Sequence, residues 1–429
     1  MLLFNKKTPY LFILLLTHNT IIQSTIPEGM LDRYKLFDDI MGISEDHFKE
    51  LVGASTGQKP DIARAKKIIT YQQSIYPRAQ TITQGTWAQP TLEQLRICVH
   101  ARLDHKISEP TQFGSLHIVV HDPQNPKKTH ARALHEQFPN GYFQVASHFN
   151  ALEDRMGNYA YNLSNMNDAP AHGEESVLAT MPAAIYRRYI MEPINLLSSV
   201  EHIFNLGFDN DNTPLIKGLK KQGPITNIDM RHFSVGVHHN IAVTSGYNDD
   251  GKMITRENDP FARPKPAYNK WMPDAGNDAI VVNQIFTAAH DINPKNRHDI
   301  EITPEQSAIA RAVIYATYQA TILAAVDNGA KTLVLMMLRP EVFNNDPSWV
   351  AQAVSSMSDI IIASGLEVHM VIRHRRADVQ ETFINEMRDI IATIESDKKI
   401  YAHDTTQLKK NIDLFFDREV VWIPLPRSP

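Results

Sequence analysis

Cysteine is almost absent from this chain of 429 residues, and Cys98 is its only one. A single cysteine excludes an internal disulfide and a zinc site built from cysteines. Because Cys98 lies in a helical pattern, we expect it to be a small buried apolar residue. Any chemistry therefore has to come from other residue types.

The chain also lacks a dominant charge. Lysine and arginine total 43, aspartate and glutamate total 48, and the net charge is −5 with no long run of one sign. A nucleic-acid-binding face needs concentrated positive charge, so no nucleic-acid partner is expected. The short basic stretch at 373–376 is interpreted as a solvated loop. Hydrophobic content of 43% is ordinary for a folded protein with a core.

An apolar stretch at residues 10–16 follows Lys6 and Lys7. It is too short to span a bilayer, so stable membrane insertion is not expected. A charged start followed by a short apolar stretch resembles a weak signal peptide. Residues 1–26 are therefore predicted to be a signal or disordered segment of a secreted protein. A segment that covers the fold in a cytoplasmic protein is the alternative.

Three further regions follow from periodicity. Residues 27–110 are predicted to be a helical N-terminal portion. Apolar residues recur at helical spacing from 30 to 51, with a break at Gly42. Thr91 and Gln94 form a capping box for a helix that runs to about residue 103. Residues 111–400 are predicted to form an α/β core. Residues 401–429 are predicted to be a C-terminal tail.

The predicted core alternates strands and helices, which is typical of a layered α/β domain. Pro182 predicts a kink or a new start in the helix that opens near Ser176. The strands are expected at 116–120, 143–147, 233–243, 280–286, 332–338 and 366–372, and the helices from 176, at 303–325, from 346 and at 379–394.

Two of these strands break abruptly into polar residues about 190 positions apart. The strand at 143–147 leads to Asn150 and Glu153, and the strand at 332–338 leads to Arg339, Asn344 and Asn345. In open α/β sheets, ligands bind just beyond the carboxyl ends of such strands. The sequence therefore predicts a pocket between two strand ends. Ordinary strand-to-helix turns are the alternative.

The residues in these turns have distinct chemical uses. The turn at 339–345 precedes a helix start, where free N–H groups and an arginine such as Arg339 bind phosphate. Asp346, as the N-cap, would occupy some of those donors itself. Asn150 offers a donor and an acceptor that suit ribose hydroxyls, and Glu153 offers acceptors. A capped helix start without a ligand is the alternative.

An acidic pair, Glu174 and Glu175, follows Gly173 at a predicted helix start. A carboxylate there has the access that acid–base chemistry at a glycosidic bond needs. The alternative is that both residues only complement the helix dipole. His148, His238, His239 and His290 suggest a metal-dependent phosphoesterase, but no tight ligand motif is present, and adjacent strand residues point to opposite faces. No metal or cofactor is therefore expected.

Several of these segments together resemble a known family. The run Phe143-Gln-Val-Ala-Ser-x-Phe-Asn-x-Leu-Glu153 is similar to the strand that opens the ligand site in divergent macrodomain proteins related to poly(ADP-ribose) glycohydrolase, a branch that includes bacterial effector ADP-ribosylhydrolases. The resemblance extends over roughly residues 35–375. Its other segments are residues 37–45, 90–95, 184–189, 233–237, 310–325 and 342–349.

The resemblance implies a macrodomain-like three-layer α/β/α fold with a mixed central sheet, and a pocket for ADP-ribose. It implies that Asn150 and Glu153 orient the distal ribose, that Glu174 or Glu175 acts in catalysis, and that Asp168 is a further catalytic candidate. The ligand-binding residues that it implies also include Gly173, Phe343 against the ribose or adenine, and Asn344 and Asn345, which hold phosphate with nearby N–H groups. Two segments depart from the family. Its triple-glycine turn is replaced by Leu338-Arg339-Pro340, and matching Asp168 and Gly173 requires a one-residue insertion.

The leading functional hypothesis is therefore an ADP-ribosyl-protein hydrolase that cleaves an N- or O-glycosidic bond, in the manner of a secreted effector. A non-catalytic ADP-ribose-binding module is the first alternative, because proline removes a backbone donor and a side chain prevents the close approach that glycine permits. The metal-dependent phosphoesterase is a weaker one.

Overall fold

The computed structural model describes residues 30–32, 35–55, 57–82, 85–107, 112–122, 125–147, 151–152, 162–163, 172–192, 194, 196, 206–208, 214–216, 229–246, 253–254, 265–266, 268–272, 280–290, 292–293, 304–338, 343–373 and 377–418. The predicted export segment at 1–26 lies outside these ranges, so secretion stays a prediction.

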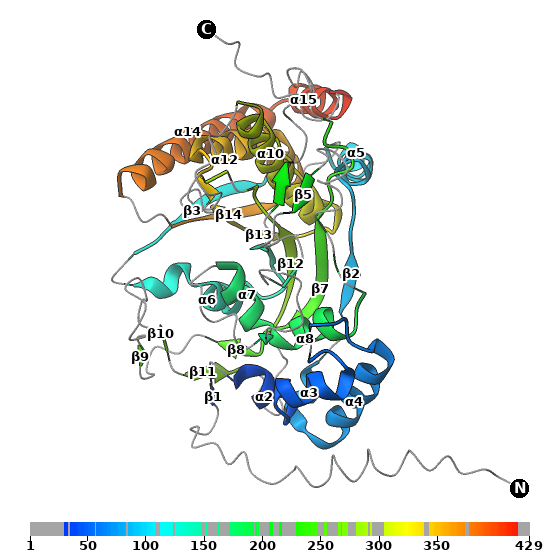
Figure 1. Cartoon of the computed structure of the whole chain (residues 1–429). Helices are drawn as coiled ribbons and strands as arrows, with labels where there is room; N and C mark the ends of the chain where they lie inside the picture. Colours follow the sequence, from blue (N-terminus) through cyan, green and yellow to red (C-terminus); the bar gives the residue numbers. More distant parts are fainter. Residues whose placement is uncertain are drawn as a thin grey trace, which may run out of the picture.

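A seven-stranded mixed sheet forms the centre of the molecule, in the order β2-β7-β12-β4-β13-β14-β3 (Figure 1). Its five strands from β12 to β3 are mutually parallel. At the other edge, β7 runs antiparallel to β12, and β2 runs antiparallel to β7. The strands are β2 (Thr86–Ala88), β3 (Ser115–Val120), β4 (Tyr142–Ala146), β7 (Gly236–Ala242), β12 (Val281–Thr287), β13 (Thr332–Met336) and β14 (Glu367–Ile372).

Helices cover both faces of this sheet. On one face, the Tyr318 hydroxyl of α10 (Pro304–Asp327) donates to the Met336 carbonyl of β13 at 2.6 Å. On the other, Gln284 Nε2 of β12 donates to the Ser176 carbonyl of α7 (His172–Ala179) at 3.0 Å. Figure 1 shows α12 (Pro347–Ser355) and α14 (Ala377–Tyr401) on the α10 side, and α6 (Ala131–Gln137) and α8 (Met181–Tyr189) on the α7 side. The predicted layered α/β class with a mixed sheet is confirmed.

The N-terminal helices build a second apolar cluster against α8. They are α2 (Leu36–Met41), α3 (Glu45–Val52) and α4 (Ile62–Ile75). Phe37, Phe48 and Tyr189 pack with ring centroids 4.9–5.9 Å apart. Gly42 ends α2 with φ +71°, a conformation that glycine adopts without strain, which confirms the predicted break.

Local signals predicted several boundaries well. Thr91 and Gln94 make the reciprocal capping-box bonds at 2.9 and 3.2 Å, and the helix they open is α5 (Leu92–Ile107). Pro182 lies in the first turn of α8, and the chain breaks between α7 and α8 at Thr180, as proline predicts. Thr303, the other predicted cap, lies outside the described residues.

Other expectations were wrong. Cys98 is exposed, because it lies on the outer face of α5 beside Ile97, whose side chain is 66% exposed. Residues 30–32 are not helical but form strand β1 (Met30–Asp32), which pairs with β11 (Tyr268–Trp271). The predicted tail contains helix α15 (Thr406–Asp417), in which Leu408 and Ile412 are buried one turn apart.

The remaining described elements are short and lie outside the main sheet. They are the α13 helix (Ser358–Ser364), the 3-10 turns Pro77–Thr81 and Pro126–Thr129, and the strands β5 (Leu206–Phe208), β6 (Pro214–Ile216), β8 (Ser245–Gly246), β9 (Met253–Ile254) and β10 (Lys265–Pro266). Among the described helices, α10 alone is long and apolar enough to cross a membrane, and 89% of its apolar window is buried inside the protein.

Candidate functional site

The two strands that the sequence singled out are neighbours in the sheet. Tyr142 and Phe143 of β4 pair with Leu333 and Val334 of β13. After β4, the next strands of the main sheet in the chain are β7 and β12, which lie on one side of β4. After β13, the next strand is β14, which lies on the opposite side. A topological switch point of this kind is where open α/β sheets bind ligands. The two strands are thus adjacent and parallel, so both carboxyl ends lie at one edge of the sheet. The pocket predicted between them stays a prediction.

Beyond Phe143 and Val334 the two strands stop pairing with each other. On their outer sides pairing continues, from Ala146 to Thr287 of β12 and from Met336 to Val371 of β14. The backbone ladder between β4 and β13 therefore ends before the carboxyl edge, and a side chain bridges the separation that follows.

Gln144 of β4 lies at this separation and was not singled out from the sequence. Its Oε1 accepts a hydrogen bond from the Met336 N–H of β13 at 3.0 Å, and the side chain is 1% exposed. Its Nε2 has no hydrogen-bond partner in the described part of the chain. An unpaired buried donor costs about 1–3 kcal/mol and calls for a structural or functional reason. The available signal was one polar residue inside an apolar strand.

The turn before α12 is tied to the end of β12. The Ile292 N–H donates to the Phe343 carbonyl at 3.0 Å, and Asn345 Nδ2 donates to the His290 carbonyl at 3.2 Å. Asn345 is 4% exposed, and its Oδ1 has no hydrogen-bond partner among the described residues. Phe343 is half-buried, and Asn344 is exposed with φ +56°. Three predicted ligand residues thus lie together at this edge.

Asp346 caps α12, as predicted. Its Oδ1 accepts from the Ser348 N–H at 2.9 Å, which uses one of the donors that a phosphate would otherwise take. Arg339, the predicted phosphate ligand, lies outside the described residues.

The turn after β4 is described only in part. Asn150, Glu153 and Asp168 lie outside the described residues. Ala151 is fully buried and has φ +59°, a conformation that costs an alanine about 1–2 kcal/mol. Strain of this kind persists where the surrounding structure holds it, and it is common at ligand sites.

Arg187 of α8 holds this strained turn. Its Nε donates to the Ala151 carbonyl at 3.0 Å, its Nη1 lies 2.9 Å from His238 Nδ1, and its guanidinium stacks over the Phe286 ring at 4.4 Å. Complete burial lowers the pKa of Arg187 to about 9. The sequence analysis did not single out Arg187 for a role.

Helix α7 carries the acidic pair toward the same edge. The Ser176 carbonyl, near the start of the helix, accepts a hydrogen bond from Gln284 in the middle of β12. The Ala179 carbonyl, at the end of the helix, accepts one from the Thr244 N–H at 2.9 Å, and Thr244 lies beyond the amino end of β12. The helix therefore starts toward the carboxyl edge, with His172, Gly173 and Glu174 in its first turn. The side chain of Glu174 lies outside the description.

Glu175 is held by Arg132 of α6 and by His130, the N-cap of that helix. Its Oε2 lies 3.0 Å from Arg132 Nε and 3.5 Å from His130 Nε2, and both the glutamate and the arginine are buried. Arg132 Nη1 also donates to Ser245 Oγ at 3.1 Å. This arrangement gives Glu175 a structural role between α6 and α7.

His135 of α6 packs against β4 as a neutral imidazole. Its ring stacks on Phe143 at 4.1 Å with an interplanar angle of 9°, its Nδ1 faces the Ala131 carbonyl, and its Nε2 lies 3.2 Å from Gln284 Nε2. The tautomer that satisfies both contacts donates from Nδ1 and accepts at Nε2. Burial lowers the pKa of His135 to about 4.

Acid is expected to destabilise the protein through His135. Because the folded state favours the neutral ring, its contribution is complete above pH 6.5 and is lost as the pH falls from 6.5 toward 4. The difference of about 2.5 pKa units between ordinary and folded values corresponds to at most about 3 kcal/mol. Urea unfolding at pH 7.5 and 4.5 should show a larger loss in the wild type than in His135→Gln. Equal losses in both proteins would contradict this role.

The histidines considered for a metal do not form a ligand group in the described chain. His238 bonds Arg187, and His239 Nδ1 lies 3.2 Å from the Tyr142 hydroxyl. His238 is buried and His239 half-exposed, in agreement with opposite faces of β7. His148 lies outside the described residues. The group of described residues that does converge like metal ligands is a different one, His100, Asp104 and Asp413.

Comparison with known proteins gives likenesses at the level of structure. No protein-family model matches the chain, and no curated protein matches it. A poly(ADP-ribose) glycohydrolase from Deinococcus radiodurans in complex with ADP-ribose is similar with a TM-score of 0.39 and 14% identity, over 73% of this chain and 97% of that one. The enzyme of the same name from Thermomonospora curvata is similar with a TM-score of 0.38 and 13% identity, over 72% of this chain and 87% of that one.

Proposed function

We propose that this chain binds ADP-ribose, free or attached to protein, and hydrolyses the ADP-ribosyl linkage. The observation that carries the proposal is the edge where β4 and β13 separate, toward which the acidic first turn of α7 points. The sequence resemblance of residues 143–153 to ADP-ribose-binding macrodomain proteins supports the choice of ligand.

The resemblance assigns the parts of ADP-ribose to individual residues. Asn150 and Glu153 would hold the distal ribose through its hydroxyls, and Phe343 would lie against a ribose or the adenine. The N–H groups that precede α12, with Arg339, would hold the pyrophosphate. Asn345 Oδ1 and Gln144 Nε2 are buried and have no hydrogen-bond partner among the described residues, so each would have a hydrogen bond to offer a ligand.

The reaction would be a hydrolysis at the anomeric carbon of the distal ribose. A water oxygen bonds to that carbon while the bond to the protein-side oxygen or nitrogen breaks. One proton leaves the water, and one reaches the leaving group. Glu174 would guide one of these proton transfers, as carboxylates do in glycoside hydrolysis.

Binding without catalysis is the second candidate. Residues 338–340 read Leu-Arg-Pro where the resembled family has three glycines, and proline removes a donor from that turn. Glu175, one of the two candidate carboxylates, is engaged by Arg132. Both observations favour a module that retains the ligand and has lost turnover.

Purified full-length protein is expected to bind ADP-ribose with micromolar affinity, roughly −7 to −8 kcal/mol. Asn150→Ala should weaken binding by about 1–3 kcal/mol, because its partners in the complex would be left unpaired. Isothermal titration calorimetry measures both, with Asn385→Ala on the exposed face of α14 as the matched control. No heat at millimolar ADP-ribose would remove the pocket assignment.

A turnover assay on the same preparation separates the two candidates. Release of ADP-ribose from ADP-ribosylated protein supports the hydrolase. Calorimetric binding with no release from serine-, arginine- or glutamate-linked substrates supports the binding module.

A further inference from the structure

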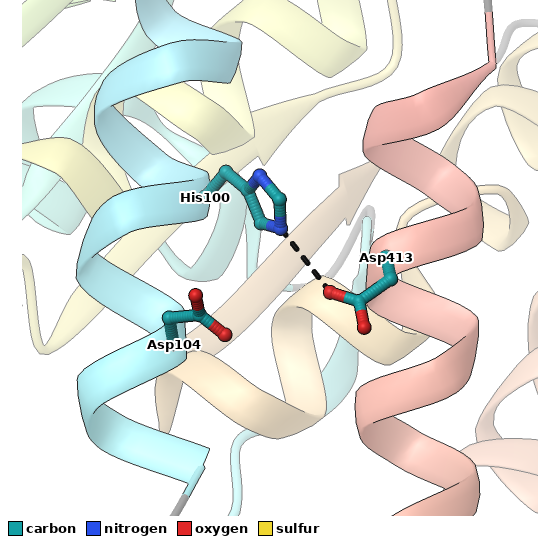
Figure 2. A group of neighbouring side chains, drawn as sticks. All are labelled: His100, Asp104 and Asp413. Carbon is teal, nitrogen blue, oxygen red and sulfur yellow. Dashed lines mark hydrogen bonds and ion pairs between the residues drawn. The ribbon is translucent and has the colours of Figure 1, made fainter.

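A group of three side chains converges between helices α5 and α15, in a part of the molecule that the proposed function does not use. His100 and Asp104 lie one turn apart on α5, and Asp413 faces them from α15 (Figure 2). Their nearest ligand atoms all lie within 4.8 Å of one another, and His100 Nε2 is 3.2 Å from Asp413 Oδ1.

The donor set suits a divalent transition-metal ion. Zn²⁺ binds histidine nitrogen and aspartate oxygen at about 2.0–2.2 Å, so tetrahedral ligands lie about 3.4 Å apart. The side chains of His100 and Asp413 are 36% and 42% exposed, and that of Asp104 is 51% exposed. Small rotations of such side chains would close the set around an ion and leave its fourth position to water.

Electrostatics also favours a cation at this place. Asp104 and Asp413 bring two carboxylates close together, which costs free energy unless positive charge lies near them. Lys409 Nζ lies 3.4 Å from Asp104 Oδ1 and supplies some of that charge. A divalent ion between both carboxylates and the imidazole would supply more, and Lys409 is flexible enough to withdraw into solvent.

The two helices are held together independently of any ion. The His100 ring stacks on Phe416 with centroids 4.7 Å apart and an interplanar angle of 23°. Arg96 of α5 donates from Nη2 to the Phe415 and Phe416 carbonyls at 2.6 and 3.1 Å. The imidazole and Asp413 are therefore positioned before an ion arrives, which reduces the cost of ordering them.

We propose that His100, Asp104 and Asp413 bind one divalent ion of the Zn²⁺ class, and that the ion fastens the C-terminal helix α15 to α5. A groove of about 520 Å³ runs along α15 and is lined in part by Asp413, one of the three proposed ligands. The proposal is independent of ADP-ribose binding.

Titration with Co²⁺, a coloured substitute for Zn²⁺, tests the site in full-length, untagged protein that has been stripped with EDTA. One equivalent of Co²⁺ should produce a visible absorption band, and Zn²⁺ should displace it. His100→Ala should weaken binding by at least about tenfold, since loss of even an outer-shell partner costs about 10–100-fold. His105→Ala, an exposed histidine on the same helix, is the control and should bind like the wild type.

A second measurement keeps the test independent of folding defects in His100→Ala. Asp413→Asn retains shape and can still hydrogen-bond His100, but a neutral amide is a poorer metal ligand. Zn²⁺ should slow hydrogen exchange in α15 of the wild type and leave it unchanged in Asp413→Asn. Absence of the Co²⁺ band, or equal affinity in His100→Ala and His105→Ala, would overturn the proposal. The three residues would then be an ordinary polar contact between helices.

Discussion

Glu174→Gln is expected to lower the rate of ADP-ribosyl hydrolysis by about 10²–10⁴-fold while ADP-ribose affinity changes by no more than a few-fold. A positioned carboxylate that transfers a proton typically accelerates a reaction by that factor. Glutamine keeps the size of the side chain and removes only the titratable group. The measurement is single-turnover release of ADP-ribose, paired with calorimetry on the same variant.

Glu93→Gln is the matched control for that experiment. Glu93 also lies in the first turn of a helix, α5, so its substitution removes the same favourable interaction with a helix dipole. Such an interaction contributes about 0.3–1 kcal/mol to stability, and its loss should not change the rate. If Glu174→Gln turns over at the wild-type rate, Asp168 becomes the next candidate. If the wild type itself never turns over, the binding module is the better description.

The carboxyl edge of the sheet was predictable because its signals are local. The apolar runs that end in polar residues locate β4 and β13, and Asp346-Pro347 locates the start of α12. A rule about parallel strands then places both ends at one edge. Neither step requires knowledge of which strands are neighbours.

The supporting groups of this edge depend on contacts between distant segments. Gln144 reaches Met336, and Arg187 reaches the Ala151 carbonyl, across separations that periodicity does not encode. The contacts of Glu175 with Arg132 and His130 are a similar case. From the sequence, Glu174 and Glu175 were equivalent, and the contact with Arg132 is what separates their expected roles.

Helix α15 was missed for a different reason. Its apolar residues Leu408, Ile412, Phe415 and Phe416 recur at helical spacing, a signal that the assignment of residues 401–429 to a tail did not use. Arg96, 319 residues before Phe415, caps its end, and His100 stacks on Phe416. These tertiary contacts, which periodicity does not reveal, are what fix α15 against α5.

Glu175→Ala is expected to destabilise the fold by about 3–5 kcal/mol. Arg132 is 1% exposed, and removal of the carboxylate 3.0 Å from its Nε leaves a buried charge without that counterion. Breaking one partner of a buried ion pair typically costs that much, whereas an exposed pair contributes about 0–1 kcal/mol. Urea unfolding should therefore show a large loss for Glu175→Ala and almost none for Glu395→Ala, which removes the surface pair with Lys398.

A double variant distinguishes this structural role from a catalytic one. Glu175→Leu combined with Arg132→Met replaces both charges by apolar groups, so no buried charge remains, and much of the lost stability should return. If hydrolysis, assayed well below the melting temperature, also returns, then Glu175 only positions α7 and its neighbour Glu174. A different result would be a Glu175→Ala variant that is as stable as the wild type but has no turnover. Stabilisation through the ion pair would then not be the role of Glu175, and Glu175 would share the proton transfer with Glu174.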